Sequence, residues 1–214
     1  MQNLTYDVVV VGGGPSGATA ADDLAKLGRH VLLLDRQGRI KPCGGAIPPR
    51  LIKDFQIPDH LLVAKARCAR MISPTDKKVD IPIENGFVGM VDRKDFDPFL
   101  RGRAAAAGAT LLTGTFLRIE RDKQGPTVVY RDKASGAERY LKCRLVIGAD
   151  GARSRVGRAE VPGGDKIPYV LAYHEIIKAP PKSAVYDPVR CDVIYDGAIS
   201  PDFYGWIFPH GDSA

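Results

Sequence analysis

The first 35 residues hold two apolar runs separated by an alanine-rich stretch. Residues 6–11 read Tyr-Asp-Val-Val-Val-Val, and residues 31–34 read Val-Leu-Leu-Leu. Short apolar runs of this kind are typical of buried strands, whereas the stretch between them has the alanine content of a helix. The pattern therefore predicts a strand, a helix and a second strand over residues 6–35.

The rest of the chain is predicted to hold one long helix and many short strands. Residues 36–49 form a loop rich in Gly and Pro, and residues 93–107 form a helix that Gly108 stops. Strands between turn residues are expected at 70–73, 78–81, 87–91, 113–121, 127–130, 138–142 and 145–149. The Lys-Ala-Ser-Gly turn joins 127–130 to 138–142 as a hairpin. The remaining β-rich stretches are 169–177 and 190–195.

These elements predict an α/β protein with a Rossmann-like dinucleotide-binding domain. Residues 1–66 and 92–160 are assigned to this domain. Residues 67–91 are inserted into it, and residues 161–214 follow it; both belong to a β-rich substrate domain. A chain of 214 residues is long enough to bury a core and to hold one domain plus part of another.

The turn after the first strand carries a phosphate-binding signature, Gly12-x-Gly14-x-x-Gly17. Gly12 allows the tight turn, Gly14 lets the backbone approach a diphosphate, and Gly17 lets the helix pack on the strand. Ser16 lies in the same turn, where the helix N-terminus faces the phosphates. An acidic residue, Asp35, ends the second strand, where it would hold a ribose hydroxyl. Together these features predict dinucleotide binding.

A second signature indicates that the dinucleotide is FAD rather than NAD. The strand at 145–149 runs into Asp150-Gly151-Ala-Arg-Ser154, which resembles the Asp-Gly motif of flavoprotein hydroxylases and their reductase relatives. The segment from Val91 to Leu100 resembles the helix start of the same superfamily, in which the residue matching Arg93 reaches the flavin dinucleotide. Taken alone, either segment could be an ordinary strand-end turn or a capped surface helix.

Composition excludes several other classes of protein. The chain is 44% hydrophobic and 26% charged, which disfavours disorder, and its net charge of +6 is scattered rather than gathered in a block. No aromatic and basic interleaving suggests a nucleic-acid partner. A solvated basic surface is one interpretation of the charge, and attraction to anionic lipid is the other.

The sequence also gives expectations about the cellular compartment, metal sites and disulfides. No apolar run reaches the ~20 residues that span a bilayer, and the first strand begins too early to leave room for a signal peptide. The cysteines show neither CxxC spacing nor a nearby His pair, so neither a metal site nor a disulfide framework is expected. The cysteines are Cys43, Cys68, Cys143 and Cys191. A reducing cytoplasm is the expected compartment.

Three further motifs resemble the geranylgeranyl reductase family, in particular its branch in chlorophyll and bacteriochlorophyll synthesis. They are Lys41-Pro-Cys-Gly-Gly-Ala-Ile-Pro48, Arg70-Met-Ile-Ser-Pro-Thr75 and Ser200-Pro-Asp-Phe-Tyr-Gly-Trp-Ile-Phe-Pro209. The resemblance implies an FAD-dependent reductase that uses NADPH to saturate isolated C=C bonds of a geranylgeranyl chain to phytyl. The substrate would be the free diphosphate or a tetrapyrrole ester, and the enzyme could sit peripherally at the inner or photosynthetic membrane. Chains of this family continue further, so an N-terminal portion is expected here.

The resemblance also implies roles for individual residues. Cys43, Gly44 and Ala46 would contact the flavin, and the thiol of Cys43 is the candidate for assisting proton delivery. The alternative is that Cys43 is simply a small residue in a tight loop. The residues expected to bind the isoprenoid chain are Tyr204, Trp206, Phe208 and Pro209.

Spacing alone supports a second interpretation of the aromatic segment. Tyr204, Trp206 and Phe208 alternate along a strand and so share one face, which is equally typical of a sheet core. His210 is a weaker candidate for a proton donor, and His174 is expected to be an ordinary strand residue.

The sequence motifs are also compatible with two other functions. An FAD-dependent aromatic hydroxylase shares both glycine signatures and the Arg93 region, but the loop at Cys43 and the Tyr-x-Trp-x-Phe-Pro segment argue against it. A non-catalytic flavin- or isoprenoid-binding fragment is the third possibility.

Overall fold

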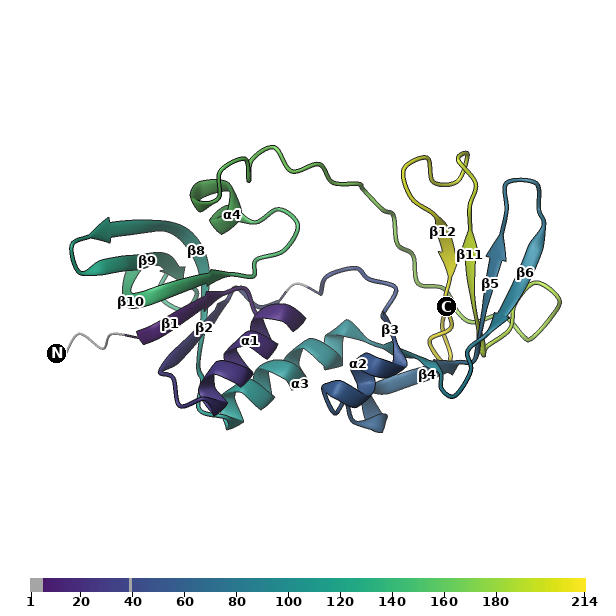
Figure 1. The fold of residues 1–214 in the computed structure, drawn as a ribbon, viewed down its shortest axis with the longest axis horizontal. Coiled ribbons are helices and arrows are strands. Elements are labelled where there is room, and N and C mark those ends of the chain that lie inside the picture. The colour runs from purple at the N-terminus through teal and green to yellow at the C-terminus, as the bar shows by residue number, and fades with distance from the viewer. Residues whose placement is uncertain (1–5, 39) are drawn as a thin grey trace. The chain divides into compact units, whose positions relative to one another are not determined.

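The computed structural model describes residues 6–38 and 40–214, which form two compact units (Figure 1). The first unit combines the N-terminal segment up to Ile40 with Asp97–Tyr169. The second combines Lys41–Phe96 with Val170–Ala214. Residues 41–66 therefore fall in the second unit, not in the nucleotide domain to which the sequence assigned them. The reason is strand pairing: two short strands within 46–66 hydrogen-bond to a strand at 88–91.

The first unit is built on a parallel sheet, as the apolar runs predict. Its strands are β1 (Tyr6–Val11), β2 (Val31–Asp35), β8 (Thr110–Asp122) and β10 (Glu138–Gly148), in the order β10-β1-β2-β8. Helix α1 (Pro15–Lys26) connects β1 to β2. Val9, Val10 and Leu32–Leu34 are almost fully buried, as expected for strands covered on both faces.

Strands β8 and β10 are long enough to pair in the parallel sheet along one part and with an antiparallel strand along another. Beyond the parallel sheet both pair antiparallel with β9 (Gly125–Asp132), so that the strand order closes on itself as β1-β10-β9-β8-β2. The hairpin between β9 and β10 is confirmed. The separate strands predicted at 138–142 and 145–149 are one strand, which changes partner from β9 to β1 at Cys143.

Helices occupy the positions that glycine and proline signals suggest. The long helix α3 (Arg93–Ala106) is confirmed, and Gly108 follows it with a φ of +108°. Two other helices are short, α2 (Pro49–Asp54) and α4 (Arg155–Glu160), and a single 3-10 turn, η1, spans Asp59–Leu61. The sequence pattern does not predict these three elements, because each is too short to show a periodic apolar face.

The second unit contains two small sheets. One has the order β3-β7-β4, formed by Ala46–Ile47, Val88–Val91 and Leu62–Ala66. The other has the order β12-β11-β5-β6, formed by Gly205–Ile207, Arg190–Ile194, Cys68–Ile72 and Lys78–Pro82. The pairing of β11 with β5 is parallel and joins residues more than 100 positions apart.

The four-stranded sheet separates charged from apolar side chains. Asp80, Arg70 and Asp192 are paired across β6, β5 and β11, so their side chains share one face. The neighbouring register brings Val79, Met71, Val193 and Trp206 together on the opposite face. One face of this sheet is thus held by ion pairs, and the other presents apolar groups.

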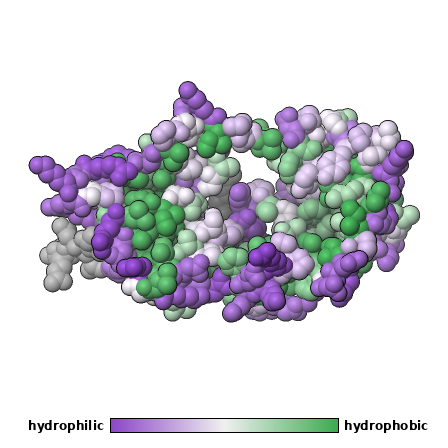
Figure 2. All heavy atoms as spheres, viewed as in Figure 1, coloured by the Kyte–Doolittle hydropathy of each residue, from purple (hydrophilic) through white to green (hydrophobic). Residues whose placement is uncertain are grey.

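The β-rich stretch expected at 169–177 is not a strand in the structure. Its backbone lacks strand pairing to the described residues until Ile177, whose amide and carbonyl bond to Ala214. Strand geometry needs a partner strand, which sequence pattern alone cannot supply. Leu171 and Tyr173 in this stretch are more than 80% exposed. Figure 2 shows hydrophobic patches among hydrophilic side chains on the face in view.

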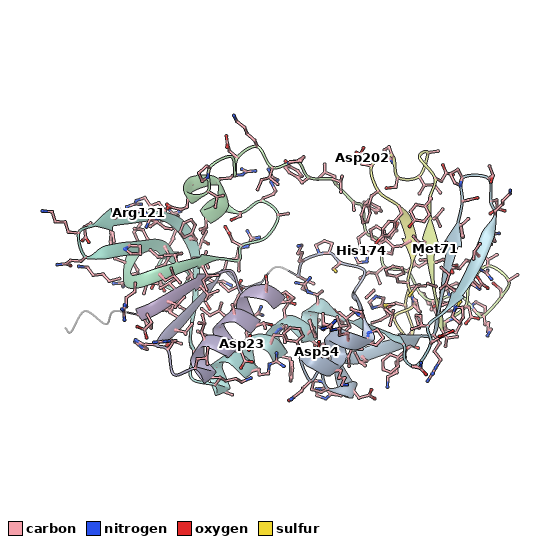
Figure 3. The ribbon with its side chains drawn as sticks, viewed as in Figure 1. Asp23, Asp54, Met71, Arg121, His174 and Asp202 are labelled. Carbon is pink, nitrogen blue, oxygen red and sulfur yellow. The ribbon has the colours of Figure 1, made fainter. Side chains whose placement is uncertain are left out.

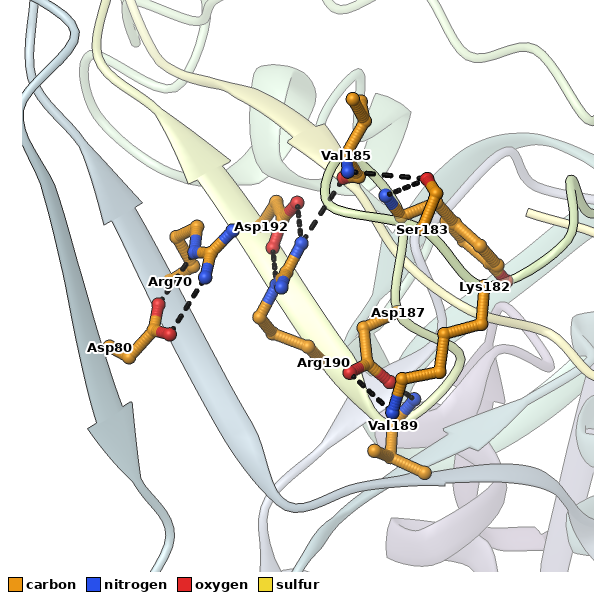
Figure 4. A network of polar contacts seen from close by, with 10 residues as sticks. Arg70, Asp80, Lys182, Ser183, Val185, Asp187, Val189, Arg190 and Asp192 are labelled. Atoms are coloured by element: carbon orange, nitrogen blue, oxygen red, sulfur yellow. Dashed lines mark hydrogen bonds and ion pairs between the residues drawn. The ribbon is translucent and has the colours of Figure 1, made fainter.

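The charged face contains a buried ion pair between Arg190 and Asp192 (Figure 4). Arg190 Nε donates to Asp192 Oδ1 at 2.5 Å, and its Nη2 donates to Asp192 Oδ2 at 3.0 Å and to the Val185 carbonyl at 3.1 Å. Both side chains are less than 10% exposed. This contact raises the pKa of Arg190 still further. The pair Arg70–Asp80 lies on the same face but is more exposed.

Removing one partner of the buried pair should unfold the second unit more readily. Asp192→Ala leaves the guanidinium of Arg190 buried without its carboxylate, which typically costs about 3–5 kcal/mol. The matched control is Asp80→Ala, whose carboxylate is half-exposed and whose loss should lower the free energy of unfolding far less. Urea unfolding of both variants measures the difference, and equal losses would contradict this account of the buried pair.

Candidate nucleotide and substrate site

The glycine turn between β1 and α1 is too tight for any other residue at two positions. Gly12 has a φ of +107°, and a Cβ placed on it would lie 2.8 Å from Asp150 Cα. A Cβ on Gly17 would collide with the Gly12 carbonyl oxygen and lie 3.1 Å from Ala149 Cβ. Such distances are closer than side chains tolerate, so both glycines are required for the helix to pack on the strand.

The two glycine signatures meet at one edge of the parallel sheet. Val11 is in register with Gly148, and the Ala149 amide donates to the Val11 carbonyl at 2.7 Å. The carboxyl ends of β1 and β10 are therefore side by side, which places Asp150 next to Gly12. Ligands of open α/β sheets bind at this edge.

The N-terminus of α1 suits a bound diphosphate. Gly14 is the N-cap and has no side-chain cap, Pro15 is the first helical residue, and the first turn contains no acidic side chain. Ser16 is exposed in that turn. The amides at the start of a helix point away from it and attract anions. A dinucleotide diphosphate therefore fits this turn.

Asp35 is held in place by two backbone amides at the end of β2. Its Oδ2 accepts from Gly13 N and its Oδ1 from Gln37 N, both at 2.8 Å. Arg101 of α3 donates from Nη1 to the Gly13 carbonyl at 2.9 Å. The sequence did not identify Arg101, because a cation on a helix gives no sign of a backbone partner 88 residues away.

Asp150 braces the turn that follows β10. Its carboxylate accepts from the Ser154 hydroxyl and from the amides of Arg155, at 2.6 Å, and Val156, at 3.3 Å. Ser154 in turn caps α4 through the Gly157 amide. Gly151 has a φ of +88°, with no atom near the position of a Cβ. Asp150 thus fixes the turn, and Gly151 leaves its outer side open.

The second unit brings together two motifs that are far apart in the sequence. Gly45 has a φ of +69°, and its carbonyl accepts from the Val91 amide at 2.9 Å. A Cβ on Gly44 would lie 2.8 Å from the Phe208 ring and 3.3 Å from Trp206 Nε1. The loop containing the exposed Cys43 therefore lies against the aromatic segment.

The aromatic side chains form a continuous row, as their alternation predicts. The ring of Trp206 lies 6.3 Å from those of both Tyr204 and Phe208. His174, labelled in Figure 3, also stacks on Trp206 at 6.3 Å. The three aromatic residues at 204, 206 and 208 are partly exposed, whereas Pro209 is fully buried. Pro209 therefore packs inside the unit.

His210 connects the loop and the aromatic row. Its Nε2 lies 3.0 Å from the Gly44 carbonyl oxygen. From the sequence, His210 is a candidate proton donor only, because a contact with Gly44, 166 positions away, leaves no local signal. Arg93 is the first residue of α3 and is partly buried.

The proposed cofactor residues thus fall in two groups. The first unit holds Gly12, Gly14, Ser16, Gly17, Asp35, Asp150 and Gly151, and the second holds Cys43, Gly44, Ala46 and Arg93. Each group is brought together locally, by the sheet edge in the first unit and by β3, β7 and α3 in the second.

Two known protein families match this chain. The FAD binding domain family matches residues 60–184, and the NAD(P)-binding Rossmann-like domain family matches residues 10–58. The chain belongs to the FAD binding domain family. The expected Rossmann-like FAD-binding fold and the choice of FAD are confirmed.

Among curated proteins, the chain is similar to geranylgeranyl reductases. It is 69% identical over 211 residues to geranylgeranyl diphosphate reductase of Rhodobacter capsulatus, covering 99% of this chain and 54% of the relative. A digeranylgeranylglycerophospholipid reductase of Methanosarcina acetivorans is 34% identical, with 97% and 52% covered. The chain spans about half the length of the curated relatives it matches. The resemblance found in the motifs is confirmed.

Solved structures agree on the fold. A geranylgeranyl bacteriochlorophyll reductase-like protein of Thermoplasma acidophilum gives a TM-score of 0.81 at 27% identity, over 97% of this chain and 54% of that one. The myxobacterial chondrochloren halogenase gives 0.73 at 19% identity, covering 98% and 51%, and shows the fold alone. Within residues 6–38 and 40–214, no helix is long and apolar enough to cross a membrane.

Closing the space beside the Gly12 carbonyl should abolish flavin binding. Gly17→Ala puts a methyl group into that carbonyl, so α1 must move away from β1 and the diphosphate turn opens. The matched control is Gly102→Ala in α3, where a Cβ meets nothing within 4 Å and should stabilise the helix by about 0.5–1 kcal/mol. Flavin-to-protein ratios after reconstitution with FAD report the difference; full occupancy of the Gly17 variant would refute the packing role.

Proposed function

We propose that this chain acts in the FAD-dependent, NADPH-driven reduction of isolated C=C bonds in a geranylgeranyl chain to phytyl. The observation that carries the proposal is the packing of the Gly44 loop on the row Tyr204–Trp206–Phe208 within one unit. That packing joins two of the three motifs by which the chain resembles geranylgeranyl reductases. The 69% identity to the Rhodobacter capsulatus enzyme supports the same function.

The first unit supplies the residues that would hold FAD. The amides at the start of α1 would bind the diphosphate, and Asp35 would accept from the adenosine ribose. Bound FAD would supply the hydride chemistry that amino-acid side chains lack, with NADPH as the reductant. Family resemblance assigns further cofactor contacts to Cys43, Gly44, Ala46 and Arg93, and these assignments stay predictions.

The aromatic row would bind the isoprenoid chain. An isolated alkene develops no oxyanion, so the protein contributes mainly by alignment and by keeping water away. Partly exposed aromatic side chains suit this task, because they offer large apolar area with few rotatable bonds. Cys43 is exposed beside the row and is the proposed source of assistance in proton delivery.

Loss of the Asp35 carboxylate should weaken FAD binding. Asp35→Ala removes a charged acceptor and also frees the Gly13 amide, which costs about 1.5–3 kcal/mol, or about 10- to 150-fold in Kd. Asp35→Asn keeps one acceptor oxygen and should lose less. Titration of the apoprotein with FAD measures both constants. An unchanged Kd for Asp35→Ala would remove this residue from the cofactor site.

Trp206→Ala should separate substrate binding from cofactor binding. Burying one large apolar side chain contributes about 1.5–3 kcal/mol, so use of geranylgeranyl diphosphate should weaken tenfold or more while the flavin spectrum stays normal. Trp206→Phe keeps an aromatic ring in the row and serves as the control. A variant that loses flavin but keeps its substrate affinity would place Trp206 in the cofactor site instead.

The rival enzyme class is the FAD-dependent aromatic hydroxylase. Hydroxylases consume oxygen with an aromatic substrate, whereas the proposed reduction needs no oxygen. Measuring oxygen uptake beside NADPH oxidation separates the two. A non-catalytic flavin- or isoprenoid-binding role predicts binding of both ligands without any NADPH turnover.

The substrate partner is an isoprenoid, either the free diphosphate or a chlorophyll or bacteriochlorophyll ester. We also propose a cytoplasmic protein in peripheral contact with the inner or photosynthetic membrane, because the chain carries a net charge of +6 and its substrate is lipophilic. No nucleic-acid partner is proposed. Cosedimentation with anionic and neutral vesicles tests the membrane contact.

A further inference from the structure

We propose that His210 is a positioning residue that ties the loop Cys43–Gly45 to the aromatic row. The bond from its Nε2 to the Gly44 carbonyl would keep the loop in one place relative to Trp206 and Phe208 during reduction. This inference rests on the proposed function, in which the loop and the row serve the same reaction. It gives His210 no direct part in proton transfer.

The chemistry of the contact fixes the direction of the hydrogen bond. A backbone carbonyl only accepts, so His210 Nε2 must carry the proton and donate across the 3.0 Å separation. A ring with a proton on Nε2 exists both as a neutral tautomer and as imidazolium. The contact therefore needs a donor at this position but no particular charge.

The loop is held by backbone pairing on one side, and on the other by the imidazole of His210 and by packing on Phe208 and Trp206. On one side the Val91 amide donates to the Gly45 carbonyl at 2.9 Å, and Ala46 pairs with Met90. On the other side stands the imidazole of His210, so close that a Cβ on Gly45 would lie 2.8 Å from its Cε1. Substitution of His210 thus removes the one side-chain hydrogen bond described for this loop, while the backbone pairing and the packing on the two rings stay.

His210 is itself well placed to act as an anchor. Pro209, just before it, is fully buried, and the His210 amide donates to the Ser213 carbonyl at 2.7 Å. The residue also directly follows the segment that carries Trp206 and Phe208. His210 therefore links the end of the aromatic segment to the Gly44 carbonyl, in addition to the direct packing of Gly44 on the two rings.

Alkylation of Cys43 by iodoacetamide at neutral pH tests the positioning role without requiring turnover. Burial raises the pKa of Cys143 to about 11 and that of Cys191 to about 12, and burial also raises the pKa of Cys68. These thiols are slow to react, and peptide mass spectrometry resolves each site. His210→Phe keeps a ring but loses the donor, so the freed loop should alter the Cys43 rate severalfold. His210→Gln restores an N–H of similar reach and should return the rate to near that of the parent chain.

Two outcomes would overturn the proposal. One is an unchanged Cys43 rate in His210→Phe, and the other is a rate in His210→Gln that matches the Phe variant. Urea unfolding of each variant is recorded first, and His210→Leu replaces His210→Phe if the larger ring prevents folding. The Cys68 rate serves as an internal control, because a general loosening of the unit would raise it as well.

Steady-state reduction of geranylgeranyl diphosphate separates this proposal from the proposed function. A positioning role predicts that His210→Phe lowers kcat tenfold or more with a smaller change in KM, and that His210→Gln recovers most of kcat. An equal kcat in all three proteins would refute the role in reduction. If the parent protein itself shows no reduction, the proposed function fails, while the alkylation result still decides whether His210 holds the loop.

Discussion

The close approach of Gly17 to the Gly12 carbonyl is the constraint on which the first unit depends. It lets α1 lie against β1 without an intervening side chain, so the helix begins at the carboxyl edge of the sheet. The parallel register of β1 with β10 then brings Asp150 to the same edge. The glycine turn, Asp35 and the Asp-Gly turn, to which we assign the nucleotide, thus meet because Gly17 has a hydrogen atom where every other residue has a Cβ.

In the second unit the main constraint is long-range strand pairing, because its four-stranded sheet joins segments far apart in the chain. Closing such long loops costs entropy before any contact forms. The bidentate pair of Arg190 and Asp192 on β11 fixes one face of this sheet, and the period-two alternation of strands then sends Val193 and Met71 to the other face. Trp206, paired with Val193, lies on this apolar face, and the aromatic row is partly exposed there.

Local signals account for what the sequence could predict. The β1–α1–β2 unit, α3 and the hairpin at 133–136 depend on residues close in sequence, and so do the glycine turn and Asp35. The pairing of β3 and β4 with β7 was missed, because it depends on distant partners rather than on local pattern. The backbone contacts of Arg101 and His210 were missed for the same reason: each side chain bonds to a backbone carbonyl, an acceptor that every residue possesses.

The fold of this chain also serves a halogenase, so the fold by itself does not choose the reaction. The glycine turn has the geometry that a dinucleotide diphosphate needs, and this geometry differs little from one flavoprotein to another. In the proposed function, selection of an isoprenoid comes from the side chains that would meet the substrate. The row at Tyr204, Trp206 and Phe208 presents apolar area, and the Gly44 loop gives it a fixed neighbour. In the proposed reduction a hydride would have to reach one alkene among several, so the relative position of loop and row is where bond selection would be set.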